Sequence, residues 1–257
     1  MMGRDELKDK VIVISGGSNG VGKAAAQECS LRGAKVIIGD HDEEAAKKVV
    51  QRIRSFGGDA EFIFTELTRV ADCENLFAGA YERYGKIDGF FQYAGITPVS
   101  PLDTCDEETF DAVMDTNFKG AFFCCQQAIK YMRLNGGGSI ILTGSAHGWG
   151  GQKDRAAYAC SKGVLRILNE HIAHQYASEH IRCNYLTLGW TPTEGELRLR
   201  RSQGITEKEL REEAASVLPM GRMCEPSDYV EGIVYLLSDA SSMMTGSIFR
   251  VTAGEYI

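Results

Sequence analysis

The feature that most restricts the fold of this chain is a regular alternation between short apolar runs and longer amphipathic segments. Residues 11–14 and 140–142 are continuously apolar, which is typical of strands buried on both faces of a parallel sheet. Strands that alternate with helical patterns indicate βαβ units. We expect strands at 11–15, 35–39, 61–64, 87–93, 139–143, 181–187 and 247–251, and helices near 22–32, 42–56, 70–84, 106–134, 154–178 and 226–238. The predicted fold is α/β, with a doubly wound parallel sheet of about seven strands and helices on both faces.

One segment departs from this alternation. Residues 190–221 connect the sixth predicted strand to the last predicted helix and are longer than a usual connection. Long connections are often lids or binding loops, so we expect a substrate loop or lid near 190–221. The alternative is a solvent-exposed helical excursion without a catalytic role. No linker rich in Pro, Gly or Ser divides the 257 residues, which predicts a single domain over 1–257.

Charge and cysteine content exclude several classes of protein. Lys and Arg number 28 and Asp and Glu 35, a net charge of −7, which argues against nucleic acid as the main partner. No apolar run reaches the length of a membrane span, and residues 1–8 contain no apolar signal region. The eight cysteines are scattered, without a C-x-x-C pair or a nearby histidine ligand. We therefore expect a cytoplasmic protein with reduced thiols, no membrane partner and no metal.

A glycine-rich loop follows the first predicted strand and opens the first predicted helix. Glycines there let the backbone turn sharply and approach a pyrophosphate, and the helix N-terminus offers free N–H groups and a partial positive charge. The spacing is G-x-x-x-G-x-G. The candidate phosphate-binding residues are Gly16, Ser18, Asn19, Gly20, Val21 and Gly22.

The end of the second predicted strand carries an acidic residue, Asp40. A carboxylate there can accept hydrogen bonds from the ribose hydroxyls of an adenosine and repels a 2′-phosphate. Neither Asn19 nor His41 offers a compensating positive charge. NAD is therefore predicted over NADP. Asp40 is alternatively the N-cap of the next helix, and the two roles are compatible.

A candidate reaction centre lies after the fifth predicted strand. Tyr158 and Lys162 are four residues apart and thus share one face of a helix. A nearby ammonium stabilises a phenolate, so we expect Lys162 to lower the pKa of Tyr158. Such a tyrosine exchanges the proton of an alcohol while a nicotinamide takes or gives the hydride. Ser145 is expected to hold the substrate oxygen.

These landmarks occur in one order along nearly the whole chain, and the sequence resembles the short-chain dehydrogenase/reductase family. The resemblance rests on the glycine loop, Asn117, the Ser145–Tyr158–Lys162 set, and the stretch from Asn184 to Gly189 and Thr193. It implies a Rossmann-type fold and a secondary alcohol/ketone oxidoreductase. The implied catalytic residues are Asn117, Ser145, Tyr158 and Lys162.

The resemblance also implies roles for individual residues. Lys162 would bind the nicotinamide ribose, and Asn117 would hold a water that links Lys162 to solvent. Further cofactor-binding residues implied by the resemblance are Glu66, Leu67, Tyr93, Ala94, Gly95, Gly189, Thr191 and Thr193.

The sequence departs from the family pattern in three places, which together involve four residues. Gln92-Tyr93 stand where the family usually has Asn-Asn, Leu188 replaces a proline, and Glu66 replaces an aspartate. The bulky Tyr93 is expected to narrow or reshape the cofactor cleft.

The substrate is expected near His147, Trp149 and Trp190, whose rings suggest a partly apolar pocket with one hydrogen-bonding group. The alternatives are that Trp149 only packs beneath its loop and that His147 points to solvent. A polyol, a hydroxy acid derivative and a small cyclic alcohol all remain open.

Two other functions stay open, a 3-oxoacyl-thioester reductase that uses NADP and an NAD-binding sensor without turnover. The resemblance further implies a homo-oligomer, a tetramer or a dimer.

Overall fold

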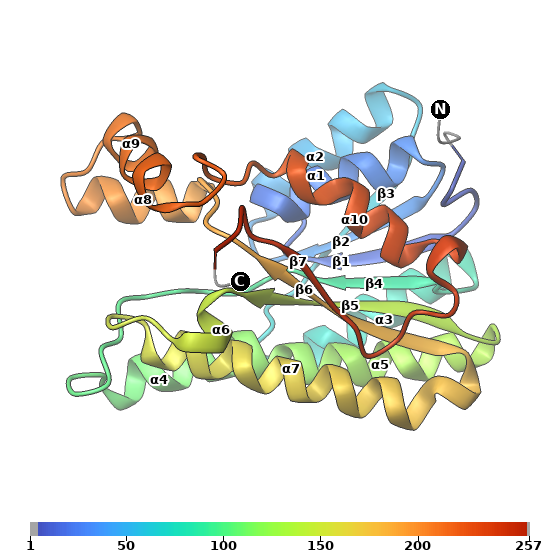
Figure 1. Cartoon of the computed structure of the whole chain (residues 1–257). Helices are drawn as coiled ribbons and strands as arrows, with labels where there is room; N and C mark the ends of the chain where they lie inside the picture. Colours follow the sequence, from blue (N-terminus) through green and yellow to red (C-terminus); the bar gives the residue numbers. More distant parts are fainter. Residues whose placement is uncertain (1–4, 256–257) are drawn as a thin grey trace.

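The seven predicted strands form one parallel sheet. The computed structural model describes residues 5–255, so the ends of the predicted domain and the first half of the 1–8 segment lie outside the described residues. The strand order is β3-β2-β1-β4-β5-β6-β7 (Figure 1). The strand bounds are β1 Val11–Ser15, β2 Lys35–Asp40, β3 Asp59–Phe64, β4 Gly89–Gln92, β5 Gly138–Ser145, β6 Ile181–Leu188 and β7 Ile248–Val251.

Alternate residues of the central strands supply two separate hydrophobic cores. Ile12 and Ile14 face one core, whereas Val13 faces the other, because successive side chains of a strand point to opposite faces. All three side chains are fully buried. The continuous apolar run therefore reflects helices on both faces of the sheet.

Helices cover both faces of the sheet, as Figure 1 shows. The helices above the sheet in this view are α1 Gly20–Leu31, α2 Glu43–Ser55 and α10 Ser227–Leu237. The helices below it are α3 Val70–Tyr84, α5 Gly120–Leu134 and α7 Ala156–Tyr176. After β3 the chain crosses back to form β4, which pairs with β1 on the side opposite β2. This reversal creates a crevice at the carboxyl ends of β1 and β4. The doubly wound fold is confirmed.

The remaining helices lie where the predicted pattern was less regular. The long helix expected at 106–134 consists of α4 Glu107–Met114, the π-helical turn η1 Asp115–Lys119 and α5. Residues 190–221 form α8 Glu194–Ser202 and α9 Glu207–Val217, which project beyond the sheet (Figure 1). The other short elements are α6 His147–Gly150, η2 Ala177–Glu179 and η3 Asp239–Ser241.

Within residues 5–255, no helix combines the length and apolar character needed to cross a membrane. The structure has the eight cysteines as free thiols, and six of them are buried.

Candidate active site

A cavity of about 870 Å³ lies at the carboxyl ends of the strands, between the sheet and α8. It brings together most residues predicted to bind cofactor or substrate. These are Gly16, Ser18, Asn19, Gly20, Val21, Asp40, Glu66, Leu67, Tyr93, Ala94, Gly95, Ser145, His147, Tyr158, Lys162, Gly189, Trp190, Thr191 and Thr193. Three predicted residues of the described chain, Gly22, Asn117 and Trp149, are outside this lining.

The glycine-rich loop is packed so tightly that side chains do not fit. Gly16 has a φ of +79°, and a Cβ there would lie 2.7 Å from Ala94 Cα. A Cβ on Gly22 would lie 2.1 Å from the Gly16 carbonyl oxygen. Gly22 thus shapes the turn rather than facing the cavity. The loop leaves the N-terminus of α1 facing the cavity, a geometry that suits a pyrophosphate.

Tyr93 lies directly beneath this loop. A Cβ on Gly20 would lie 2.6 Å from the Tyr93 hydroxyl, and the ring packs against Phe91 at a centroid distance of 5.9 Å. Burial raises the pKa of Tyr93 to about 12, although a hydrogen bond from the Val21 N–H opposes the shift. The hydroxyl is therefore neutral at physiological pH and forms part of the floor of the cofactor end.

Asp40 is held rigidly at the end of β2, where its side chain is buried. Its Oδ2 accepts a hydrogen bond from the Ser18 N–H at 3.1 Å, and its Oδ1 accepts one from the Asp42 N–H at 3.1 Å. Asp42, not Asp40, caps α2, by accepting from the Ala45 N–H at 3.0 Å. The alternative that Asp40 caps the helix is wrong because that role belongs to the residue two positions later.

Ser145, Tyr158 and Lys162 converge at the other end of the cavity. The Lys162 Nζ lies 5.6 Å from the centre of the Tyr158 ring and donates to the Thr143 carbonyl at 2.9 Å. The Ser145 Oγ accepts a hydrogen bond from the His147 N–H at 3.2 Å, and it also hydrogen-bonds Tyr158.

Burial controls the protonation of this end of the cavity. It raises the pKa of Tyr158 above the ordinary value, against the lowering effects of Ser145 and Arg155. Burial also lowers the pKa of Lys162 to about 8. The expected lowering of the Tyr158 pKa by Lys162 is therefore wrong as a net effect, because desolvation of the phenolate outweighs the nearby charges. Tyr158 carries its proton at neutral pH.

Asn117 lies in the π-helical turn η1, a feature often found at functional sites. It is near Lys162, because a Cβ on Gly95 would lie 3.0 Å from the Asn117 Oδ1 and 3.7 Å from the Lys162 Nζ. Its Oδ1 accepts from the Ile96 N–H at 2.7 Å, and its Nδ2 donates to the Ile96 carbonyl at 2.9 Å and to Ser161 Oγ at 3.1 Å. Asn117 thereby joins the loop after β4 to α7 and fixes the wall beside Lys162.

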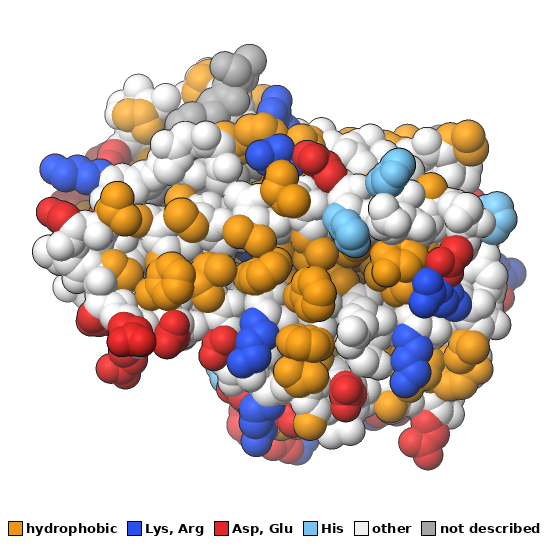
Figure 2. Space-filling model, turned by 90° about the horizontal axis from the view of Figure 1, so that it is seen from below, with side chains coloured by type: hydrophobic (Ala, Val, Ile, Leu, Met, Phe, Trp, Pro, Cys, Tyr) orange, Lys and Arg blue, Asp and Glu red, His pale blue; other side chains and the backbone are white. Residues whose placement is uncertain are grey.

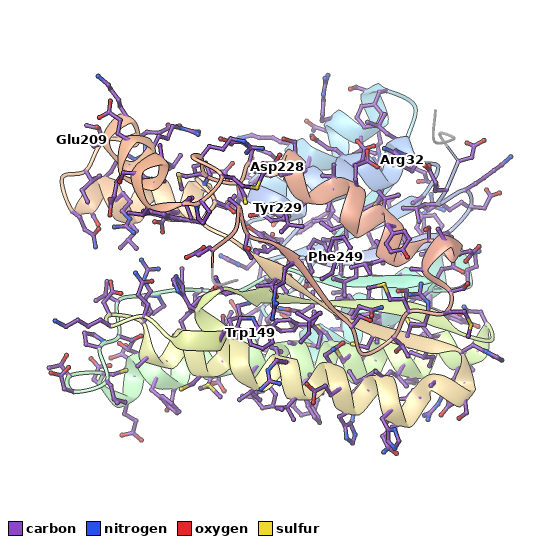
Figure 3. All side chains as sticks on the ribbon, viewed as in Figure 1. Arg32, Trp149, Glu209, Asp228, Tyr229 and Phe249 are labelled. Carbon is purple, nitrogen blue, oxygen red and sulfur yellow. The ribbon has the colours of Figure 1, made fainter. Side chains whose placement is uncertain are left out.

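The strand end after β6 leads into α8. A Cβ on Gly189 would lie 2.6 Å from Thr252 Cα, so this position requires glycine. The Thr191 hydroxyl is 2.5 Å from that of Tyr229, which lies in α10 (Figure 3). Thr193 is the N-cap of α8 and accepts from the Glu196 N–H at 3.3 Å.

The three predicted substrate residues have different positions. His147 lines the cavity with its ring 6.3 Å from that of Tyr158, and burial lowers its pKa. Trp190 also lines the cavity and donates to Glu196 at 2.9 Å. Trp149 does not belong to this site. It is 40% exposed. The Cζ atoms of Arg166 and Arg250 lie 5.3 and 4.6 Å from the centre of its ring. The short helix α6 directs it outward.

Several charged residues line the cavity but were not predicted as site residues, among them Arg155, Glu194, Glu196 and Arg200. Arg155 had a usable signal, because it precedes Tyr158 by three residues and so lies near it at the start of α7. Glu194 accepts from the Gly20 N–H at 3.0 Å and pairs with Lys23 at 3.3 Å. This contact joins α8 to the glycine loop across 174 residues of sequence and has no local signal.

The geometry defines a class of protein. A phosphate-binding glycine loop with an acidic residue after β2, and a Ser, Tyr and Lys set in the same cavity, together suit a nicotinamide-dependent oxidoreductase acting on CH–OH groups.

Known proteins agree with this class. A family model described as enoyl-(acyl carrier protein) reductase matches residues 16–255. An uncharacterized oxidoreductase of Thermotoga maritima is 35% identical over 249 residues, covering 97% of this chain and 98% of that protein. L-rhamnose 1-dehydrogenase (NAD(P)(+)) of Azotobacter vinelandii is 32% identical over 256 residues, 98% of each chain. A crystal structure of 3-ketoacyl-(acyl-carrier-protein) reductase from Brucella melitensis, complexed with NADH, matches with a TM-score of 0.89 at 26% identity. It covers 98% of this chain and 100% of that one.

The chain belongs to the short-chain dehydrogenase/reductase family. It is an NAD(P)-dependent oxidoreductase acting on CH–OH groups.

Proposed function

We propose that this protein transfers a hydride between NAD and a small secondary alcohol or ketone, with Tyr158 as the proton donor and acceptor. The observation that carries the proposal is the single cavity that holds the glycine loop at one end and Ser145, Tyr158 and Lys162 at the other. The N-terminus of α1 suits the pyrophosphate, and Asp40 suits the adenosine ribose. Bound there, the nicotinamide supplies the hydride chemistry.

The remaining steps belong to the side chains. Tyr158 is protonated at neutral pH because burial raises its pKa, so it donates a proton to the carbonyl oxygen of a ketone. Ser145 hydrogen-bonds both Tyr158 and the same substrate oxygen. Lys162 is fixed by the Thr143 carbonyl and stabilises the phenolate that forms. In the oxidative direction the phenolate accepts the alcohol proton.

The preference for NAD rests on Asp40. Its carboxylate is buried and held by two backbone N–H groups, so it cannot turn away from a 2′-phosphate. The Brucella relative was crystallised with NADH, which supports the same choice here. We infer that NADP binds much more weakly.

The test follows nicotinamide absorbance with NAD(H) and NADP(H) side by side across secondary alcohols and ketones. Turnover with NAD(H) and little with NADP(H) is expected. Turnover mainly with NADP(H), strongest on 3-oxoacyl thioesters, would instead support the thioester reductase. Tight NADH binding without turnover on any substrate would favour a sensor.

We further propose that the protein works as a cytoplasmic homo-oligomer. Exposed apolar side chains belong to the helices below the sheet, including Phe122 and Ile167, which are 42% and 54% exposed. Figure 2 shows hydrophobic groups spread over this lower face. A patch of this kind often marks an interface. Light scattering after gel filtration is expected to give a dimer or tetramer, and Phe122→Ser is expected to weaken it. A monomer in the wild type would contradict this.

A further inference from the structure

We propose that the substrate carries a carboxylate that binds Arg155, so that the protein acts on hydroxy acids or oxo acids rather than on neutral alcohols. This inference rests on the proposed function and narrows it. Its basis is a buried guanidinium in the substrate half of the cavity whose hydrogen-bonding capacity is incompletely used.

Arg155 immediately precedes α7, one helical turn before Tyr158. It lines the cavity, and only 5% of its surface is exposed. Its positive charge lowers the pKa values of both Tyr158 and His147, so the guanidinium lies within electrostatic reach of the reacting group.

The loop after β4 holds Arg155 in place. The Arg155 Nη1 donates to Thr97 Oγ1 at 2.7 Å and to the Thr97 carbonyl at 3.4 Å. The backbone beside it pairs with Ser100, where the Ala156 N–H donates to the Ser100 carbonyl at 2.8 Å. The orientation is therefore set before a ligand arrives, which reduces the entropy cost of binding.

The opposite edge of the guanidinium is not satisfied. The Arg155 Nε is buried and has no hydrogen-bond partner. The nearest carboxylates stand beyond hydrogen-bond distance, with Asp154 Oδ2 at 3.8 Å from Nε and Glu196 Oε2 at 3.9 Å from Nη2. A guanidinium binds a carboxylate bidentately through two such N–H groups. A small adjustment of this edge would satisfy it with a substrate carboxylate.

Glu196 does not fully neutralise Arg155. Its Oε1 already accepts from Trp190 Nε1 at 2.9 Å and from Arg200 Nε at 2.8 Å. Among the described residues that line the cavity, Glu196 is the one carboxylate within 4 Å of Arg155. Two guanidinium groups therefore share one cavity carboxylate, and this favours an anion over a neutral or cationic ligand.

The test uses dead-end complexes, which require no turnover. Calorimetry measures the binding of 2-oxobutyrate, 3-oxobutyrate and 4-oxopentanoate, each with its neutral amide, to the wild-type protein saturated with NAD⁺. The series varies the distance between ketone and carboxylate. At least one acid is expected to bind tenfold or more tightly than its amide. If every amide binds as well as its acid, or if no acid binds, the inference is overturned.

Three variants separate a carboxylate site from a structural role. Arg155→Gln is expected to abolish the preference for the acid while NADH affinity is retained, and Arg155→Lys to restore part of it. Arg166→Gln, the matched control, removes an arginine charge from α7 outside the cavity and is expected to keep the full preference. If folded Arg155→Gln keeps the full preference for the acid over the amide, the proposal is also refuted. Failure of NAD⁺ to bind the wild type would instead refute the proposed function.

Discussion

Replacing Asp40 by serine is expected to relax the choice between NADH and NADPH. The carboxylate is buried at the cofactor end and held by the N–H groups of Ser18 and Asp42. At a separation of about 5 Å and an effective dielectric constant of about 20, one like-charge pair costs about 3 kcal/mol. This corresponds to roughly two orders of magnitude in the ratio of dissociation constants. The serine hydroxyl retains one acceptor for the loop and removes the charge.

The assay measures the fluorescence of bound NADH and NADPH, together with kcat/KM for each. Wild type is expected to bind NADH about a hundredfold more tightly than NADPH, and Asp40→Ser to lose most of this ratio, chiefly through tighter NADPH binding. Glu43→Gln, an exposed charge in the first turn of α2, is the matched control and should leave the ratio unchanged. The reasoning is refuted if wild type shows no preference, or if folded Asp40→Ser keeps it.

Three further predictions concern the rest of the cavity. Burial lowers the pKa of Lys162 from 10.5 to about 8. At pH 7 the charged side chain therefore costs the folded protein about 3 kcal/mol, and Lys162→Met should raise the free energy of unfolding by up to that amount. Wild type, but not this variant, should gain stability between pH 8 and 10.5, where the unfolded chain binds a proton that the folded protein has lost. Glu194 occupies the N-terminus of α1, so Glu194→Gln should bind NADH about two- to fivefold more tightly. His147→Ala should alter the ratio of kcat/KM among substrates, and Trp149→Ala should not.

Each of these has a clear contradicting result. For Lys162, the free energy of unfolding is measured by denaturation in urea. A lower value in Lys162→Met than in wild type, or the same dependence of this free energy on pH in both proteins, would mean that the buried charge is not costly. Weaker NADH binding by Glu194→Gln would mean that the α8 contact assists the cofactor instead of competing with it. An altered substrate profile in Trp149→Ala would mean that the Trp149 ring contacts the substrate after all.

The fold was largely predictable because it depends on local patterns. The apolar run at β1 and the glycine-rich loop that follows it required only the side-chain period and the turn preferences of nearby residues. The contacts of Glu194 and Arg155 arise from packing between elements distant in sequence, which no local pattern encodes. Trp149 shows that proximity in sequence can also mislead. It lies close to Ser145 in the sequence and was therefore predicted to line the pocket, but the turn of α6 directs its ring toward Arg250.

The net pKa of Tyr158 was also beyond sequence reasoning. The spacing to Lys162 indicates a neighbouring charge, but the depth of burial decides the direction of the shift, and burial is a property of the whole fold.

The most direct test of the account is the rate of hydride transfer in Tyr158→Phe, measured by nicotinamide absorbance at saturating NADH on a ketone that wild type reduces. The substitution removes the phenol hydroxyl and leaves the ring. The rate is expected to fall about a thousandfold, within the usual range for general acid catalysis, with NADH affinity nearly unchanged. A variant that binds NADH normally and keeps a rate close to that of wild type would contradict the assignment of Tyr158 as the proton donor.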